Sequence, residues 1–188
     1  MRIIIGVATV PARYPFFSKK VLPNLKAMSD EVWVYTDGNS PVLIRHTSFG
    51  TSLVDCPHQS VGDAGKFFGA ERTTHQDFYY LSCDDDLIYP WDYAEKMIQW
   101  IDFFDRRAVI SLHGSTFSQM PVTSYYKDKG TIPCLGVSLV AQRVLFPGSG
   151  ASGFHSSCLN IDVKSQFLCR NMADVWFGRL LQIQKIPA

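Results

Sequence analysis

The apolar run from Ile3 to Val10 constrains the fold of this chain more than any other feature of its sequence. The run is continuous and rich in β-branched residues. This is typical of a strand buried on both faces, in a sheet that helices cover on both sides. Pro11 ends the run. A helix-like pattern over 16–28 and a second strand-like run over 31–36 follow it. This order of strand, helix and strand predicts an α/β architecture.

The alternation continues through most of the chain. We expect further strands over 52–55, 77–83 and 108–112, and further helices over 65–72, 91–104 and 174–184. Pro23 should kink or split the first helix. Residues 114–133 follow neither pattern and predict a long loop of polar and aromatic residues. The expected fold is therefore a single α/β domain with a mixed, mainly parallel central sheet flanked by helices.

Length and composition exclude several classes of protein. The 188 residues are 46% hydrophobic and 19% charged, which suits one domain with a full core and excludes a disordered chain. A net charge of +1 does not indicate a general nucleic-acid-binding surface. No apolar run is long enough for a transmembrane segment, and no signal-peptide cleavage pattern is present. Five scattered cysteines without a CxxC pair favour the reducing cytoplasm over a disulfide framework.

Three consecutive carboxylates, Asp84, Asp85 and Asp86, directly follow the strand expected over 77–83. Like charges this close repel one another, and a divalent cation would remove the repulsion. In an extended backbone, Asp84 and Asp86 would lie on one side and Asp85 on the other. Because open α/β sheets bind ligands at the carboxyl ends of strands, the triplet predicts a Mn²⁺ or Mg²⁺ site that also contacts phosphate. A solvated turn before the next helix explains the same residues equally well.

Further motifs occur in a consistent order around this triplet. They are GVATVPAR after the first strand, VYTDG at the end of the second, GDAGKFFGAE, YYLSCDDDLIYPWDY and NMADVWFGRLLQIQKIP. Together they resemble the metal-dependent glycosyltransferases of the GT-A fold, in particular the family-2-like enzymes with a DxD motif. The resemblance covers most of the chain. It implies one catalytic domain over 1–188 that is short at its C-terminal end for this class.

The resemblance also implies a set of nucleotide-binding residues. They are Thr9, Pro11, Arg13, Asp37, Gly65, Lys66, Asp84 and Asp85. Arg13 would lie near the base or a phosphate, and Asp37 would contact the uracil or the ribose. Gly65 would let the backbone approach the ligand, and Lys66 would supply a positive charge for phosphate.

The metal and the catalytic base follow from the same resemblance. Asp84 would contact the ribose or the metal, and Asp86 would coordinate the metal. Asp174 matches the position where inverting members keep the base that takes the acceptor proton. An aspartate that opens a helix is also favoured by the helix dipole, so a capping role explains Asp174 as well. The loop over 114–133 would fold over the donor and exclude water.

Two other residues are candidates without a fixed role. His155 lies in a glycine-rich segment that could line the acceptor side or reach the metal, although a polar loop residue is an equally good interpretation. Trp91 follows the acidic triplet and could form a surface for a sugar or an acceptor, but a tryptophan at a helix start is more often a packing anchor.

The predicted function is transfer of a sugar from a nucleotide diphosphate donor, UDP-linked, to an acceptor hydroxyl with inversion. The acceptor, whether glycan, lipid, protein or modified nucleic acid, is left open. One alternative is a sugar-phosphate nucleotidyltransferase, although the first loop lacks the glycine-rich, basic pattern expected for a triphosphate. The other is a non-catalytic module that binds a nucleotide sugar.

Overall fold

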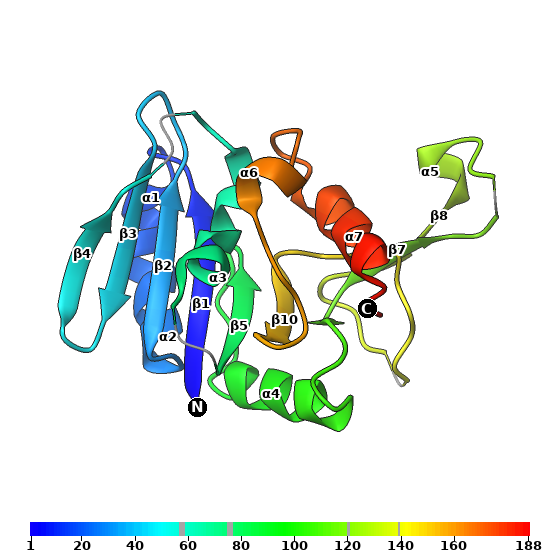
Figure 1. Ribbon diagram of the computed structural model, residues 1–188, viewed down its shortest axis with the longest axis horizontal. Coiled ribbons are helices and arrows are strands. Elements are labelled where there is room, and N and C mark those ends of the chain that lie inside the picture. Colours follow the sequence, from blue (N-terminus) through cyan, green and yellow to red (C-terminus); the bar gives the residue numbers. More distant parts are fainter. Residues whose placement is uncertain (57–58, 75–76, 120, 139) are drawn as a thin grey trace.

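The computed structural model describes residues 1–56, 59–74, 77–119, 121–138 and 140–188. The strands are β1 (Arg2–Thr9), β2 (Glu31–Thr36), β3 (Val42–Thr47), β4 (Gly50–Val54), β5 (Phe78–Cys83), β6 (Ile110–Ser111), β7 (Gly114–Phe117), β8 (Lys129–Ile132), β9 (Phe146–Pro147) and β10 (Ala151–His155). Seven of them form the central sheet in the order β4-β3-β2-β1-β5-β10-β6 (Figure 1). A smaller sheet has the order β8-β7-β9.

The directions of the strands correct part of the prediction. β1 is parallel to β2 and to β5, whereas the other four neighbouring pairs of the central sheet are antiparallel. The cause is that β3 and β10 run against the other five strands. Only residues 37–41 separate β2 from β3, which is too short for the crossover that a parallel pair requires. The sheet is mixed as predicted, but the expectation of mainly parallel pairing is wrong.

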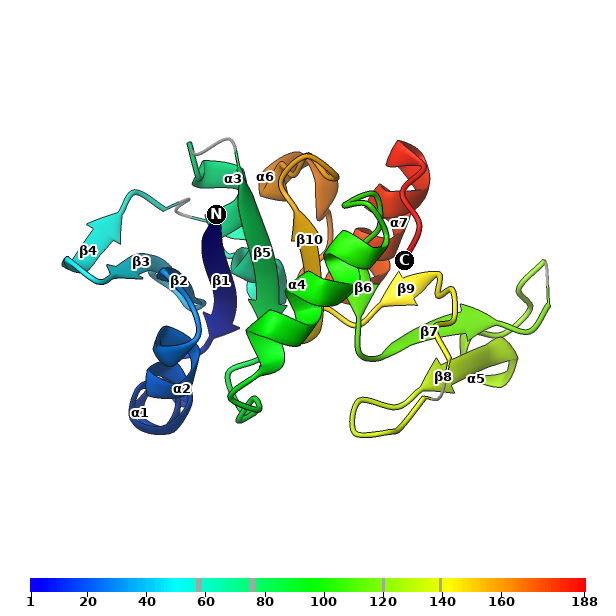
Figure 2. The ribbon, with the colours of Figure 1, turned by 90° about the horizontal axis from the view of Figure 1, so that it is seen from below.

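Helices cover both faces of the central sheet. They are α1 (Tyr14–Phe16), a π-helical turn (Phe17–Val21), α2 (Leu22–Ala27), a 3₁₀ helix (Gly62–Phe67), α3 (Phe68–Arg72), α4 (Tyr93–Phe103), α5 (Tyr125–Asp128), α6 (Val163–Gln166) and α7 (Ala173–Gln184). Figure 2 shows α1, α2 and α4 on one face of the sheet and α3, α6 and α7 on the other. Each face has its own apolar core, and β1 contributes Ile5 to one and Ile4 to the other. The prediction of a first strand buried on both faces is confirmed.

Several predicted elements agree closely with the structure. The strand expected over 31–36 is β2 itself, and the expected helices over 91–104 and 174–184 differ from α4 and α7 by at most two residues at an end. The helix expected over 16–28 is present and is interrupted as predicted: the π-helical turn precedes Pro23, which lies at the start of α2. A wider turn accommodates the missing proline N–H without ending the helix.

The structure corrects the prediction of a long loop over 114–133. Its ends pair as the antiparallel strands β7 and β8, and the short helix α5 lies between them. These strands have few apolar residues, so the alternation that identifies a strand is weak there. Figures 1 and 2 both show this β7–α5–β8 arm projecting from the rest of the molecule. The strand β3, which forms an antiparallel hairpin with β2, was also not predicted.

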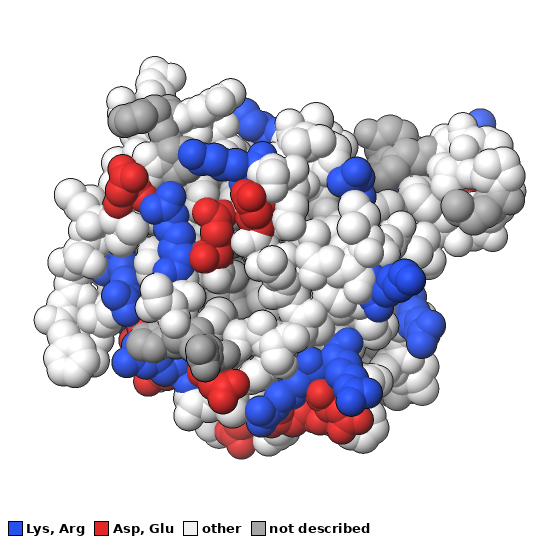
Figure 3. Space-filling view, viewed as in Figure 1, with Lys and Arg blue, Asp and Glu red and all other residues white. Residues whose placement is uncertain are grey.

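Charges are mixed on the surface. On the face shown in Figure 3, Lys and Arg side chains are interspersed with Asp and Glu side chains, in keeping with the net charge of +1. Among the described residues, none of the helices has the length and apolar character required to cross a bilayer. The cytoplasmic location stays a prediction.

Candidate functional site

The carboxyl ends of β1, β2 and β5 meet at one edge of the central sheet and border a cavity of about 220 Å³, called here the first hollow. Its wall includes predicted and unpredicted residues: Thr9, Arg13, Asp37, Lys66, Asp84, Asp85 and Asp86 from the first group, and Asp63 and Asn171 from the second. Parallel strands place the residues that follow them at a common edge. The sequence therefore predicted correctly that the acidic triplet shares a cleft with Thr9 and Asp37.

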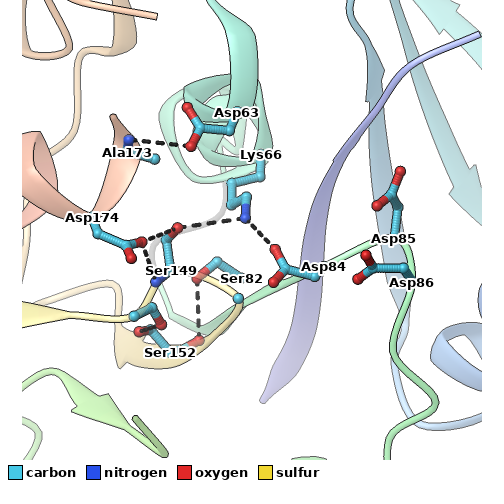
Figure 4. Close-up of polar contacts among 12 residues, drawn as sticks. Asp63, Lys66, Ser82, Asp84, Asp85, Asp86, Ser149, Ser152, Ala173 and Asp174 are labelled. Carbon is cyan, nitrogen blue, oxygen red and sulfur yellow. Dashed lines mark hydrogen bonds and ion pairs between the residues drawn. The ribbon is translucent and has the colours of Figure 1, made fainter. Parts of the chain in front are cut away.

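The acidic triplet does not stay extended. The backbone turns at Asp85 and Asp86, so the expected sharing of one side by Asp84 and Asp86 is wrong. The carboxylate of Asp84 points toward Lys66 and lies 2.6 Å from its Nζ atom, whereas Asp85 and Asp86 lie together away from it (Figure 4). Lys66 is only 4% exposed. A buried ammonium group is tolerable because Asp84 neutralises it, which makes this pair the electrostatic centre of the site.

Asp85 is buried against the first strand and the loop that follows it. Its Oδ2 atom accepts a hydrogen bond of 2.6 Å from the Thr9 hydroxyl and lies 3.0 Å from Nε of Arg13. Burial raises the pKa of Asp85, and the bond from Thr9 and the charge of Arg13 offset only part of that effect. Arg13 also lies 3.5 Å from the exposed Asp86. The guanidinium is thus held at the rim of the first hollow.

Asp37 lies buried at the end of β2 with both oxygens engaged. Oδ1 accepts hydrogen bonds from the hydroxyls of Tyr35 and Ser60, and Oδ2 accepts one of 2.9 Å from Arg170. Burial acts to raise the pKa of Asp37, but these three hydrogen bonds outweigh it and the pKa lies below its usual value. A ligand that binds Asp37 through Oδ2 must therefore displace or share Arg170.

A second hollow of about 690 Å³ adjoins the first and shares Asp63, Lys66, Asp84 and Asn171 with it. Its other walls include His113, Phe146, Ser149 and Asp174. Oδ1 of Asp174 accepts 2.8 Å and 2.7 Å hydrogen bonds from the backbone N–H and hydroxyl of Ser149. No hydrogen bond to Oδ2 of Asp174 is found among the described residues. Asp174 lies in the first turn of α7 but is not its N-cap, which is Met172.

A continuous line of polar contacts joins the two hollows. The Nζ atom of Lys66 lies 2.6 Å from Asp84 and 3.5 Å from the Ser149 hydroxyl, which in turn bonds to Asp174 (Figure 4). The loop at Ser149 comes close because Gly150 has no side chain. A Cβ atom there would lie 2.0 Å from a carboxylate oxygen of Asp84. The ammonium group of Lys66 therefore lies between Asp84, which it contacts directly, and Asp174, to which Ser149 links it.

Asp63, Tyr89 and His113 are among the residues at this edge that were not predicted. Asp63 lines both hollows, and its Oδ2 atom accepts a 3.2 Å hydrogen bond from the backbone N–H of Ala173 at the start of α7. Its Oδ1 atom is buried with no hydrogen-bond partner in the described structure, and burial raises its pKa. The Tyr89 hydroxyl bonds to the N–H of Asp84 and the carbonyl of Gly150, which fixes the acidic turn against the opposite loop. His113 lines the second hollow. Asp63 and Tyr89 lie within the motifs GDAGKFFGAE and YYLSCDDDLIYPWDY, so the sequence carried a signal for both of them but none for His113.

Four predicted residues lie outside the two hollows. Pro11 is exposed, and Gly65 is turned inward, where a Cβ atom would lie 1.9 Å from the ring of Tyr35. Trp91 is 84% exposed, so it is not a packing anchor, but it lines neither hollow.

The structure also corrects the prediction that His155 lies near the acceptor or the metal. It pairs with Tyr79 in the sheet, four residues before Cys83 and about 13 Å from the acidic edge along the strand. Its Nδ1 atom contacts the hydroxyl of Ser157, and burial lowers its pKa. The sequence misplaced His155 because it did not reveal that β10 runs away from this edge.

The predicted Mn²⁺ or Mg²⁺ site can be tested against the donor atoms. Carboxylate oxygens suit either ion, but Asp84 pairs with Lys66 while Asp86 faces Arg13 on the other side of the turn. Within the described ranges, no group of three or more His, Cys, Asp or Glu residues is arranged to hold a metal ion. The arrangement does not fit an ion held jointly by Asp84 and Asp86, and the cofactor stays a prediction.

Comparison with known proteins assigns no family to the chain. No model of a protein family matches the sequence, and no curated protein matches it at a significant level.

Proposed function

We propose that this protein binds a nucleotide diphosphate sugar in the first hollow and transfers the sugar to an acceptor hydroxyl in the second. One observation carries the proposal: a buried lysine and an arginine face a cavity at the carboxyl ends of parallel strands, and that cavity adjoins another with a carboxylate on its wall. A diphosphate needs positive charge and a strand-end site. Glycosyl transfer to a hydroxyl needs a base nearby.

The residues of the first hollow would bind the donor. The ammonium of Lys66 and the guanidinium of Arg13 would exchange part of their contact with carboxylates for contact with phosphate oxygens. Asp37 would bind the ribose or the base when Arg170 moves aside. These side chains are held by hydrogen bonds before any ligand arrives, so little conformational entropy is lost on binding.

Asp174 would act in the second hollow. Its Oδ2 atom would take the proton of the acceptor hydroxyl while the acceptor oxygen attacks the anomeric carbon. The bond from that carbon to the diphosphate then breaks, and the leaving diphosphate keeps the electron pair. Lys66, two contacts from Asp174, would stabilise the charge that develops on the leaving group. A direct displacement of this kind inverts the anomeric centre.

A thermal-shift panel of nucleotide sugars, each with and without Mn²⁺, tests the proposal. At about 100 times its Kd, a true donor should stabilise the fold by about 2.7 kcal/mol and raise the melting temperature by roughly 5–10 °C. Because Asp84 and Asp86 lie on opposite sides of the turn, loss of a Mn²⁺-dependent part of the shift in Asp86→Ala would mean that Asp86 binds the ion without Asp84. Asp77→Ala is the matched control, since Asp77 is an exposed carboxylate outside both hollows. If no nucleotide sugar shifts the melt, the proposal is wrong.

Two assays distinguish the alternative functions, a sugar-phosphate nucleotidyltransferase and a non-catalytic binding module. Release of pyrophosphate from UTP and a sugar 1-phosphate would indicate a nucleotidyltransferase. A donor that binds but is neither transferred nor hydrolysed, with or without Asp174→Asn, would indicate a non-catalytic binding module.

A further inference from the structure

The segment over 133–145, between β8 and β9, exposes apolar side chains to solvent. Leu135 is 89% exposed, Val137 is 92% exposed and Val140 is 67% exposed. A turn closed by a 3.0 Å hydrogen bond from the N–H of Gly136 to the carbonyl of Pro133 holds Leu135 near its tip. Turn tips are usually polar because water surrounds them. A cluster of exposed aliphatic side chains on such a segment is typical of a surface that contacts something apolar.

Both ends of this segment lie beside the second hollow. Ile132 and Pro147 pair with Gly114 from opposite sides, and Phe146 lines the hollow itself. The segment is therefore anchored at both ends next to the proposed acceptor site.

The charges around the segment are mostly positive. From residue 114 to residue 147 the basic residues are Lys127, Lys129 and Arg143, and the one acidic residue is Asp128. Asp128 is buried within the arm, where it accepts hydrogen bonds from the backbone N–H groups of Thr123 and Ser124. Its charge is satisfied inside the arm, so the arm is basic although the whole chain is nearly neutral.

Two other exposed apolar groups lack this combination. Trp100, Phe103 and Phe104 form an aromatic cluster at the end of α4, where the charges of Asp102 and Asp105 balance those of Arg106 and Arg107. Phe49 and Leu53, on the β3–β4 hairpin, lie at the far edge of the central sheet. Leu168 and Met172 are also exposed beside Arg170, and Met172 lines the second hollow, but Leu135, Val137 and Val140 of the segment over 133–145 are more exposed than either.

We propose that the segment over 133–145 docks the protein onto an anionic lipid bilayer. The aliphatic side chains would enter the boundary between headgroups and acyl chains, and the basic residues would contact anionic headgroups. The second hollow would then face the bilayer, so its acceptor would be presented by a lipid. This last step alone depends on the proposed function, since docking can be measured without a nucleotide sugar.

Co-sedimentation with vesicles tests the docking. The full chain should sediment with vesicles of phosphatidylcholine and phosphatidylglycerol, and more weakly with phosphatidylcholine alone. Combined Leu135→Ser, Val137→Ser and Val140→Ser should weaken binding by about tenfold or more, because the apolar contact is lost. Arg143→Gln should weaken binding by about fivefold on the anionic vesicles only. Combined Phe49→Ser and Leu53→Ser, which removes comparable exposed apolar surface elsewhere, should not change it.

Three outcomes would overturn the inference. The first is no sedimentation of the wild-type chain with anionic vesicles. The second is an equal loss in the Phe49 and Leu53 variant, which would indicate non-specific adhesion. The third is a wild-type dimer in light scattering that the triple serine variant converts to a monomer without any vesicle binding, which would show that a second copy covers the segment. Far-UV circular dichroism and the melting temperature of each variant establish that it is folded.

Discussion

The two hollows share Lys66 but are assembled in different ways. The first is bordered by residues that directly follow three neighbouring parallel strands, so its shape depends on the register of β1, β2 and β5. The second takes its walls from segments far apart in sequence, around residues 63, 113, 149 and 174. The strand side of the first hollow is therefore as rigid as the sheet, whereas its opposite side at Lys66 and Asn171, and the whole second hollow, depend on how loops and α7 pack. Substitutions that affect donor binding and turnover to different extents should therefore distinguish the two hollows.

Asp174→Asn should have the largest effect, and it should act on the second hollow alone. Asparagine can still accept the hydrogen bonds from Ser149 but cannot take a proton, so turnover should fall by about 10³-fold. The melt shift caused by the nucleotide sugar should persist. Steady-state kinetics and thermal shift measure the two quantities, with Asp77→Asn as the control. Unchanged turnover would mean that the second hollow is not where the proton leaves.

Gly6→Ala tests how closely β1 packs against the 3₁₀ helix that carries Lys66. A Cβ atom on Gly6 would lie 1.8 Å from the Tyr80 hydroxyl oxygen and 2.0 Å from the backbone oxygen of Lys66. Neither can yield cheaply, because both are buried and bonded to each other. We expect a loss of about 3 kcal/mol in the free energy of unfolding, measured with urea. Gly38→Ala is the control, since its nearest neighbour would lie at an ordinary 3.6 Å. Equal effects of both substitutions would contradict the packing argument.

Lys66→Met tests the residue that both hollows share. Methionine fills the buried channel but offers no charge, so affinity for the donor should fall by roughly 10–100-fold, the worth of a charge-assisted hydrogen bond. Turnover should fall further, because the leaving group loses a stabilising charge. Isothermal titration and kinetics give the two values. Lys20→Met, on an exposed lysine, should change neither, and an unaffected affinity in Lys66→Met would remove Lys66 from the donor site.

Asp63→Asn should have the smallest effect and should depend on pH. Burial raises the folded pKa of Asp63 above its unfolded value of 3.8, so the folded state binds more protons and stability falls as pH rises through the folded pKa. The substitution should therefore stabilise the protein at neutral pH by about 1 kcal/mol and have little effect below pH 3.8.

Asp37→Asn provides the contrast to Asp63→Asn. The folded pKa of Asp37 is lowered, so its charge favours folding above the unfolded pKa and that contribution is lost as pH falls. Asp37→Asn should therefore destabilise the protein at neutral pH. Urea unfolding across the pH range measures both variants, and the same sign for both would contradict these assignments.

The sequence predicted the elements whose signal is local. β2, α4 and α7 were recognised because apolar spacing and turn residues stand within each segment, and the placement of Asp37 in one site with the acidic triplet came from the resemblance to GT-A enzymes. The contact of Lys66 with Asp84 and of Ser149 with Asp174 was not predicted. These contacts depend on the turn of the backbone at Asp85 and on the direction of β10, which no local pattern encodes.

The reversed direction of β10 also affects how this edge can change in length. In a sheet of parallel strands, every loop at the carboxyl edge departs from a strand. β10 begins at that edge, so the chain through Ser149 and Gly150 arrives there instead. Insertions between β6 and β9 can therefore enlarge or close one side of the cleft while the loops that follow β1, β2 and β5, and the register of those strands, stay unchanged. The side of the cleft next to β10 can therefore vary in loop length, while the side formed by the ends of β1, β2 and β5 is constrained by the sheet.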